Sequence, residues 1–145
     1  MYKLALLNKM ERMNLSMPKI KQTNAKLMVN ISGEPCSKAN SRIMIFRKNG
    51  RPRSIKNKAA QDYVESFLKQ VIALRVQSPF ISGEDVILNC WIYYASYRKD
   101  LDESLIMDCL QKSGILKNDR QIKEKHIYHR IDKEAPHAII LIEGR

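Results

Sequence analysis

The residues best suited to chemistry are acidic, in a chain that is otherwise strongly basic. The 145 residues include 26 Lys and Arg against 15 Asp and Glu, a formal net charge of +11. Asp100 and Asp102 alternate within the segment 99–103, and alternate side chains of an extended chain point to the same side. Two neighbouring carboxylates repel each other, and a divalent cation removes that penalty. Because Mg²⁺ prefers carboxylate oxygens together with water and phosphate, the pair predicts a magnesium site.

A third acid follows at a distance that suits the same site. Asp119 lies 17 residues beyond Asp102, and a strand, helix and turn of that length can return to the edge where they began. Asp119 is therefore a candidate third metal ligand. The alternative is structural: Asp102 caps a helix, and Asp100 is a surface carboxylate paired with Arg98 or Lys99.

A basic segment supplies candidate contacts to a polyanion. Residues 38–58 hold eight Lys and Arg and no acid, interleaved with short polar side chains. Such side chains dominate contacts to the nucleic-acid backbone, and a chain this basic favours a polyanionic partner. The alternative is a solvated face that only aids solubility. The candidate DNA-binding residues are Lys38, Asn40, Arg42, Arg51, Arg53, Lys56 and Lys58.

The spacing of apolar residues predicts the elements that must position these side chains. Alternation predicts strands over 27–32, 86–97, 122–131 and 137–142, the last two as a closing pair. Helical spacing predicts a helix over 60–72, and a second helix runs to about Lys112, with Asp102 or Ser104 as its cap and Gly114 as its stop. Asn49-Gly50 predicts a hairpin turn, and residues 119–121 a second turn.

Composition also bounds the setting of the protein. No apolar run is long enough to span a bilayer, and the N-terminus lacks the pattern of a secretory signal. Three cysteines without a Cys-x-x-Cys pair are typical of small buried thiols in a reducing cytoplasm. Residues 1–26 form a basic N-terminal extension, interpreted as a frayed tail or as a short amphipathic helix that touches DNA, the body of the protein or a membrane surface.

Motifs around the aspartates resemble those of a nuclease family. Asp100-Leu101-Asp102, then Asp108-Cys109-Leu110, Gly114 and the run 118–122 (Asn-Asp-Arg-Gln-Ile) resemble the RusA family of Holliday junction resolvases. In that family an Asp-Leu-Asp-Asn motif opens a helix that carries Asp-Ala-Leu and ends at a glycine, and an Asp-Asp-x-Gln-Ile turn brings in the last acid. Residues 35–42 resemble the family's early Pro-x-Ser-x-Asn loop. The resemblance covers roughly residues 27–143.

The resemblance implies both fold and function. It implies one compact α+β domain over residues 27–145, with a mixed sheet packed against two main helices, that forms a homodimer. It implies a Mg²⁺-dependent endodeoxyribonuclease, with Mn²⁺ as a substitute, that resolves four-way DNA junctions by paired nicks in recombination and repair. Asp100, Asp102 and Asp119 are then its metal ligands and catalytic residues, in the cytoplasm of a bacterial or phage-infected cell. The alternatives are a weak or inactive binder of branched DNA, and a nuclease that acts on flaps or forks.

Three positions depart from the family pattern. Glu103 replaces the usual Asn and is a candidate additional ligand. Asn118 replaces the first Asp of the last pair. The family's helix lysine has no counterpart, because the direct count reaches Ile106. Its role is either unfilled or passes to Lys99, Lys112, Lys117 or another cation.

Overall fold

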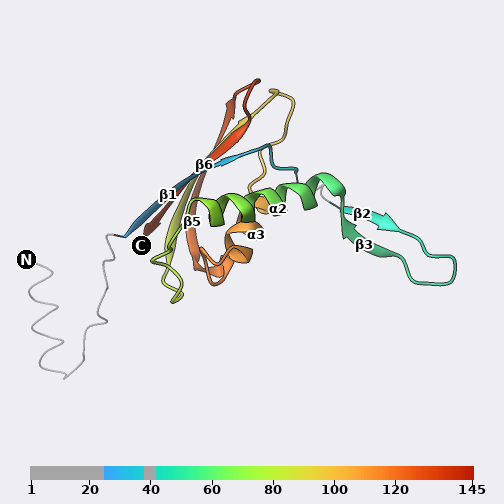
Figure 1. Cartoon of the computed structure of the whole chain (residues 1–145), viewed down its shortest axis with the longest axis horizontal. Helices are drawn as coiled ribbons and strands as arrows, with labels where there is room; N and C mark the ends of the chain where they lie inside the picture. Colours follow the sequence, from blue (N-terminus) through green and yellow to red (C-terminus); the bar gives the residue numbers. More distant parts are fainter. Residues whose placement is uncertain (1–24, 38–41) are drawn as a thin grey trace, which may run out of the picture.

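A mixed four-stranded sheet carries the fold (Figure 1). The computed structural model describes residues 25–37 and 42–145. β1 (Lys26–Ser32), β6 (His137–Gly144), β4 (Val86–Tyr94) and β5 (Ile122–Ile131) lie side by side in the order β1-β6-β4-β5. β6 is antiparallel to both neighbours, whereas β4 and β5 are parallel. A parallel pair needs a crossover connection, which contains α3 (Ser104–Lys112).

Two helices cover one face of this sheet. α2 (Lys58–Ala73) and α3 lie on the same side of it (Figure 1). The buried residues of β4 are every second one, as a strand with one covered face requires. They form one core with the buried side of each helix: Ala60, Tyr63, Phe67 and Val71 of α2, and Leu105, Ile106, Cys109 and Leu110 of α3. No described helix covers the opposite face, which we call the open face.

A two-stranded hairpin projects from the body of the domain (Figure 1). β2 (Arg42–Ile45) pairs with β3 (Arg53–Lys56), and the pair extends beyond the first turn of α2. Asn57 joins the hairpin to that helix and caps it, because its Oδ1 accepts a hydrogen bond from the Ala60 N–H at 2.8 Å. Residues 42–56 of the basic segment therefore form an arm.

The expected α+β architecture, with a mixed sheet against two helices, is confirmed. Three details differ. β3 was not expected. β4 ends at Tyr94 rather than at residue 97, because the next N–H, of Ala95, bonds to the carboxylate of Glu34. The two closing strands are not neighbours, because β4 lies between β5 and β6.

The N-terminal extension expected over residues 1–26 lies outside the described residues up to residue 24, and Lys26 already belongs to β1. Within the part of the chain that the structure describes, no helix combines the length and the apolarity needed to cross a membrane.

Candidate active site

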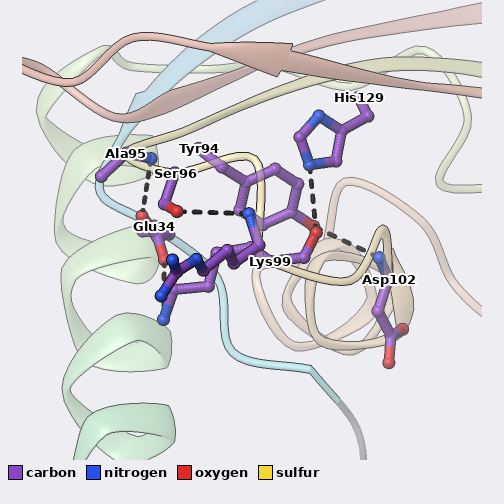
Figure 2. Close-up of polar contacts among 8 residues, drawn as sticks. Glu34, Tyr94, Ala95, Ser96, Lys99, Asp102 and His129 are labelled. Carbon is purple, nitrogen blue, oxygen red and sulfur yellow. Dashed lines mark hydrogen bonds and ion pairs between the residues drawn. The ribbon is translucent and has the colours of Figure 1, made fainter.

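The loop that follows β4 carries the first two aspartates and is held by Glu34. Gly33 turns the chain after β1 with a φ of 108°, a conformation that favours glycine. Glu34 then reaches the end of β4, where one carboxylate oxygen accepts from the Ala95 N–H at 2.9 Å and the other lies 3.3 Å from the Lys99 ammonium (Figure 2). Glu34 therefore fixes both the beginning and the middle of the loop.

A histidine on β5 holds the same loop from the other side. His129 Nε2 lies 3.0 Å from the carbonyl oxygen of Lys99 (Figure 2). A carbonyl can only accept, so Nε2 carries the hydrogen and donates it. The His129 ring also stacks on Tyr94, with centroids 4.8 Å apart, and lies 6.4 Å from the ring of Tyr97. The imidazole is thus a support for the loop and not an isolated surface residue.

Asp100 lies at a small polar cavity. It is exposed and lines a cavity of about 190 Å³. Ser37 also lines it, and its buried Oγ has no hydrogen-bond partner among the residues that the structure describes. The other lining residues are Glu34, Pro35, Cys36, Asn57, Tyr94, Arg98 and Lys99. The cavity therefore joins the end of β4, the turn after β1 and the start of α2.

Asp102 is held by one hydrogen bond through its backbone and one through its side chain. Its N–H donates to the Tyr94 hydroxyl at 3.2 Å, and its carboxylate Oδ1 accepts from the Ser104 N–H at 2.9 Å. Figure 2 shows the carboxylate directed away from the tyrosine. Burial raises the pKa of Tyr94, so its hydroxyl is neutral at physiological pH. Asp102 thus bonds to the first N–H of α3, but the N-cap residue is Glu103 and not Asp102 or Ser104 as predicted, and Asp102 does not line the cavity of Asp100.

Glu103 has a cationic partner on β5. It is the residue before the first turn of α3 and forms an ion pair with Lys125, which also approaches the sulfur of Met107. Ile106, at the position of the family's lysine, is fully buried in the core. Among the cations, Lys125 pairs with Glu103, while Arg98 and Lys99 line the cavity of Asp100.

Asp119 lies at the opposite end of the parallel strand pair. It begins the short 3₁₀ helix η2 (Asp119–Gln121), directly before β5, and the register sets Ile122 beside Val86, the first residue of β4. Asp100 lies six residues after Tyr94, the last residue of β4, and lines a cavity together with it. A nine-residue strand separates these ends by roughly 26 Å at about 3.3 Å per residue. The path from Asp102 to Asp119 does not return to its starting edge.

The segment 118–121 has a structural role that accounts for its motif. Asn118 Oδ1 accepts from the Arg120 N–H at 2.9 Å, and Asn118 and Gln121 form a capping box around η2. Gln121 is buried and donates to the carbonyls of Phe80 and Glu84, each at 2.9 Å. Its Oε1 accepts from the N–H groups of Lys117 and Asn118. These bonds tie the start of β5 to the loop that precedes β4.

Carboxylate oxygens are the ligands that Mg²⁺ prefers, although the three aspartates do not lie close together. Over residues 25–37 and 42–145, no three His, Cys, Asp or Glu side chains are grouped closely enough to hold a metal ion. Mg²⁺ needs fewer protein ligands than that, because it commonly binds through one or two carboxylates, with water and substrate phosphate completing its shell. Asp100 and Asp102 supply two carboxylates in the loop after β4, although only Asp100 lines the cavity, and Asp119 of the same chain does not join them.

The candidate DNA-binding residues fall mainly on the arm. Arg42 and Arg53 lie on paired strands of the hairpin, Arg51 lies at its turn, and all three are exposed. Lys58 is exposed in the first turn of α2. Lys56 belongs to β3, and Lys38 and Asn40 lie outside the described residues.

The structure adds residues that sequence reasoning missed. Glu34, Tyr94 and His129 come from β1–β2, β4 and β5, and only the topology of the chain brings them together. Cys36 also lines the cavity, where burial raises the pKa of its thiol and Lys99 opposes that shift. Cys90 and Cys109 are buried thiols, as expected, and burial raises the pKa of Cys90 to about 12.

No protein-family model matches this chain, and a comparison with curated proteins gives no match either. The resemblance to the RusA family therefore depends on the motifs themselves, and within them Asn118 and Gln121 have a structural role in this chain.

Proposed function

We propose that this protein is a Mg²⁺-dependent endodeoxyribonuclease that acts on branched DNA, with the four-way junction as its substrate. One observation carries the proposal: the basic arm and the cavity of Asp100 meet at Asn57, which follows β3, caps α2 and lines the cavity. A DNA backbone that lies along the arm is thereby led to the carboxylates at the end of β4. The arm holds phosphate without reading sequence, so it suits recognition of DNA shape.

Each residue of the loop has a separate task in this mechanism. Asp100 and Asp102 would hold Mg²⁺, which when bound supplies a Lewis acid and a water of lowered pKa for attack on phosphorus. Lys99, at the same cavity, places a positive charge beside the phosphate. Glu34 and His129 keep Lys99 in place through its ammonium and its carbonyl, respectively.

A second candidate function is binding of branched DNA without cleavage. The separation of Asp119 from Asp100 and Ile106 in the place of the family's lysine both favour it. Cleavage of the four-way junction in Mg²⁺ distinguishes the two functions. A nuclease specific for flaps or forks is distinguished by comparing junction, fork and duplex at equal concentration.

The decisive variant is Asp102→Asn, with Glu65→Gln as its matched control, because Glu65 is an exposed carboxylate on α2 paired with Lys69. We expect junction cleavage to fall about 100-fold or more in Asp102→Asn, since even outer-shell partners of metal ligands contribute 10–100-fold. Glu65→Gln should cleave like the wild type, and both variants should retain junction affinity in EDTA. Wild-type activity that Asp102→Asn retains in full, or activity that persists in EDTA, would contradict the proposal.

The paired nicks of junction resolution require two active sites, so the proposal includes a homodimer. The open face is the surface that supports it. Apolar residues line its centre, among them Trp91, which stacks on Tyr128 with centroids 5.4 Å apart. Met28 on the edge strand β1 is 69% exposed. A two-fold axis through this face would give one assembly two active sites.

A further inference from the structure

The arm carries a run of exposed apolar side chains whose purpose its charge does not explain. Ile43, Met44, Ile45 and Phe46 are consecutive, and their exposed fractions are 49%, 53%, 38% and 77%. Such a run is unfavourable in water unless a partner covers it. Phe46 has the largest exposed fraction of the four and stands where β2 leads into the turn.

The hairpin gains little packing from the rest of the described chain. β2 pairs with β3, and all four residues of β2 are exposed. An isolated two-stranded hairpin is marginally stable in water, so this one needs a partner to bury its apolar residues. Figure 1 shows that it projects away from the core instead of packing on it.

The charge of the arm identifies that partner as a polyanion. No acid occurs from residue 42 to residue 61, while Arg47, Lys48 and Arg51 surround the turn beside Phe46. A second copy of this protein would bring a like-charged arm against this one. The repulsion between the two arms disfavours a dimer formed through them. DNA offers both features that the arm needs, phosphates for its cations and an apolar space between bases. Proteins that kink DNA insert phenylalanine or similar wedges between base steps in this way.

We propose that Phe46 is a wedge that inserts beside an unstacked base at a DNA branch point, while Arg47 and Arg51 hold the flanking phosphates. Insertion costs least where stacking is already interrupted, so the wedge gives preference for a junction over plain duplex. This inference rests on the DNA binding of the proposed function but not on cleavage.

The test measures affinity for a four-way junction and for a duplex of the same sequence, in EDTA so that no cleavage occurs. We expect Phe46→Ala to weaken junction binding about 10-fold, as loss of one base–aromatic contact does, and duplex binding less than about twofold. Phe46→Trp should keep the preference. Ile72→Ala is the matched control, since Ile72 is 76% exposed on α2, and it should change neither affinity.

A charge variant separates the wedge from the cations. Arg51→Ala should weaken junction and duplex equally and reduce the slope of log K against log salt by about 0.9. A 2-aminopurine base at the branch point should change its fluorescence on binding of wild type and not of Phe46→Ala, which reports insertion directly.

Several outcomes would overturn the wedge. They are an equal loss on junction and duplex in Phe46→Ala, an unchanged 2-aminopurine signal with wild type, and a change in sedimentation that shows Phe46 in self-association. If Phe46→Ala loses binding to phosphatidylserine vesicles but keeps the preference for junctions, the arm would be assigned to a membrane surface instead.

If wild type prefers junctions through Phe46 but never cleaves them, the wedge stands and the nuclease fails. If wild type cleaves junctions but Phe46→Ala changes no affinity, the nuclease stands and the wedge fails. Absence of any DNA binding contradicts both the nuclease and the wedge.

Discussion

At the scale of single residues, Tyr94 connects the core to the candidate metal ligands. Its ring is buried under the helices, while its hydroxyl accepts the N–H of Asp102 at 3.2 Å. Tyr94→Phe keeps the ring and removes that acceptor, so the loop around Asp102 should be less well fixed. We expect junction cleavage to fall about 5–10-fold, in line with the loss of about 1 kcal/mol from one hydrogen bond. Junction affinity in EDTA should not change, and an equal fall in affinity would show that Tyr94 acts on DNA binding instead.

A buried thiol makes stability depend on alkaline pH. Burial raises the pKa of Cys90 from its ordinary value of 9.0 to about 12. Above pH 9 the unfolded chain loses the proton while the folded chain keeps it, so stability is full below pH 9 and is lost as the pH rises toward 12. Between pH 9 and pH 12, Cys90 lowers the free energy of unfolding by about 1.4 kcal/mol per pH unit.

The variant Cys90→Ala isolates the contribution of this thiol to the pH dependence of stability. Urea unfolding at pH 8, 9, 10 and 11 should show a steeper decline in the free energy of unfolding for wild type than for Cys90→Ala. Cys109→Ala, which also removes a buried thiol, is the control for the cavity that either change leaves. Parallel declines in wild type and Cys90→Ala would show that the thiol titrates alike in the folded and unfolded chain.

At the scale of elements, Gln121 joins three segments through four hydrogen bonds. Its amide bonds to the carbonyls of Phe80 and Glu84 and to the N–H groups of Lys117 and Asn118. Gln121→Ala leaves these backbone groups without that partner in a buried site, where each unsatisfied group costs about 1–3 kcal/mol. We expect a loss of about 3 kcal/mol or more in unfolding free energy, measured by urea titration. Gln111→Ala on the exposed side of α3 should cost under about 1 kcal/mol, and a similar value for Gln121→Ala would refute its anchoring role.

The position of η2 leads to a prediction for Asp119. Because it lies at the far end of β4 from Asp100, Asp119→Asn should leave junction cleavage within about threefold of wild type. A loss of 100-fold at unchanged melting temperature would contradict this. Asp119 would then have to come from a second chain, and mixing Asp102→Asn with Asp119→Asn should restore activity by forming one intact site.

The elements of this fold could largely be predicted from sequence, because periodic burial marks them. β4 buries every second residue and α2 buries one side, which alternation and helical spacing predict. β3 was missed because Arg53-Ser54-Ile55-Lys56 has little apolar pattern and pairs only with β2 within the described chain. The location of Asp119 was missed because spacing gives the length of a path and not its direction, which the parallel pairing of β4 and β5 decides.

At the scale of the whole molecule, charge is distributed unevenly. The chain has a formal charge of +11, yet on the open face two cations balance two carboxylates. Lys26 pairs with Glu143 at 3.1 Å, Glu124 pairs with His126, and Arg130 lies over the ring of Tyr128. Two copies of a strongly basic protein can approach closely only where this repulsion is absent. In the proposed homodimer the open face, where the charges balance, meets this condition and leaves the arm available to DNA.

This distribution predicts that a charge on the open face breaks the proposed homodimer. Met28→Glu adds a carboxylate at an exposed position of β1, next to Leu141 in the register of β6, and should convert a dimer to a monomer in sedimentation velocity. The monomer should stay folded, because Met28 is outside the core, and should nick single strands of a junction without pairing the nicks. Ile72→Glu on α2 adds the same charge on the helical side and should remain dimeric. A wild-type monomer, or a dimer that survives Met28→Glu but not Ile72→Glu, would place the contact elsewhere.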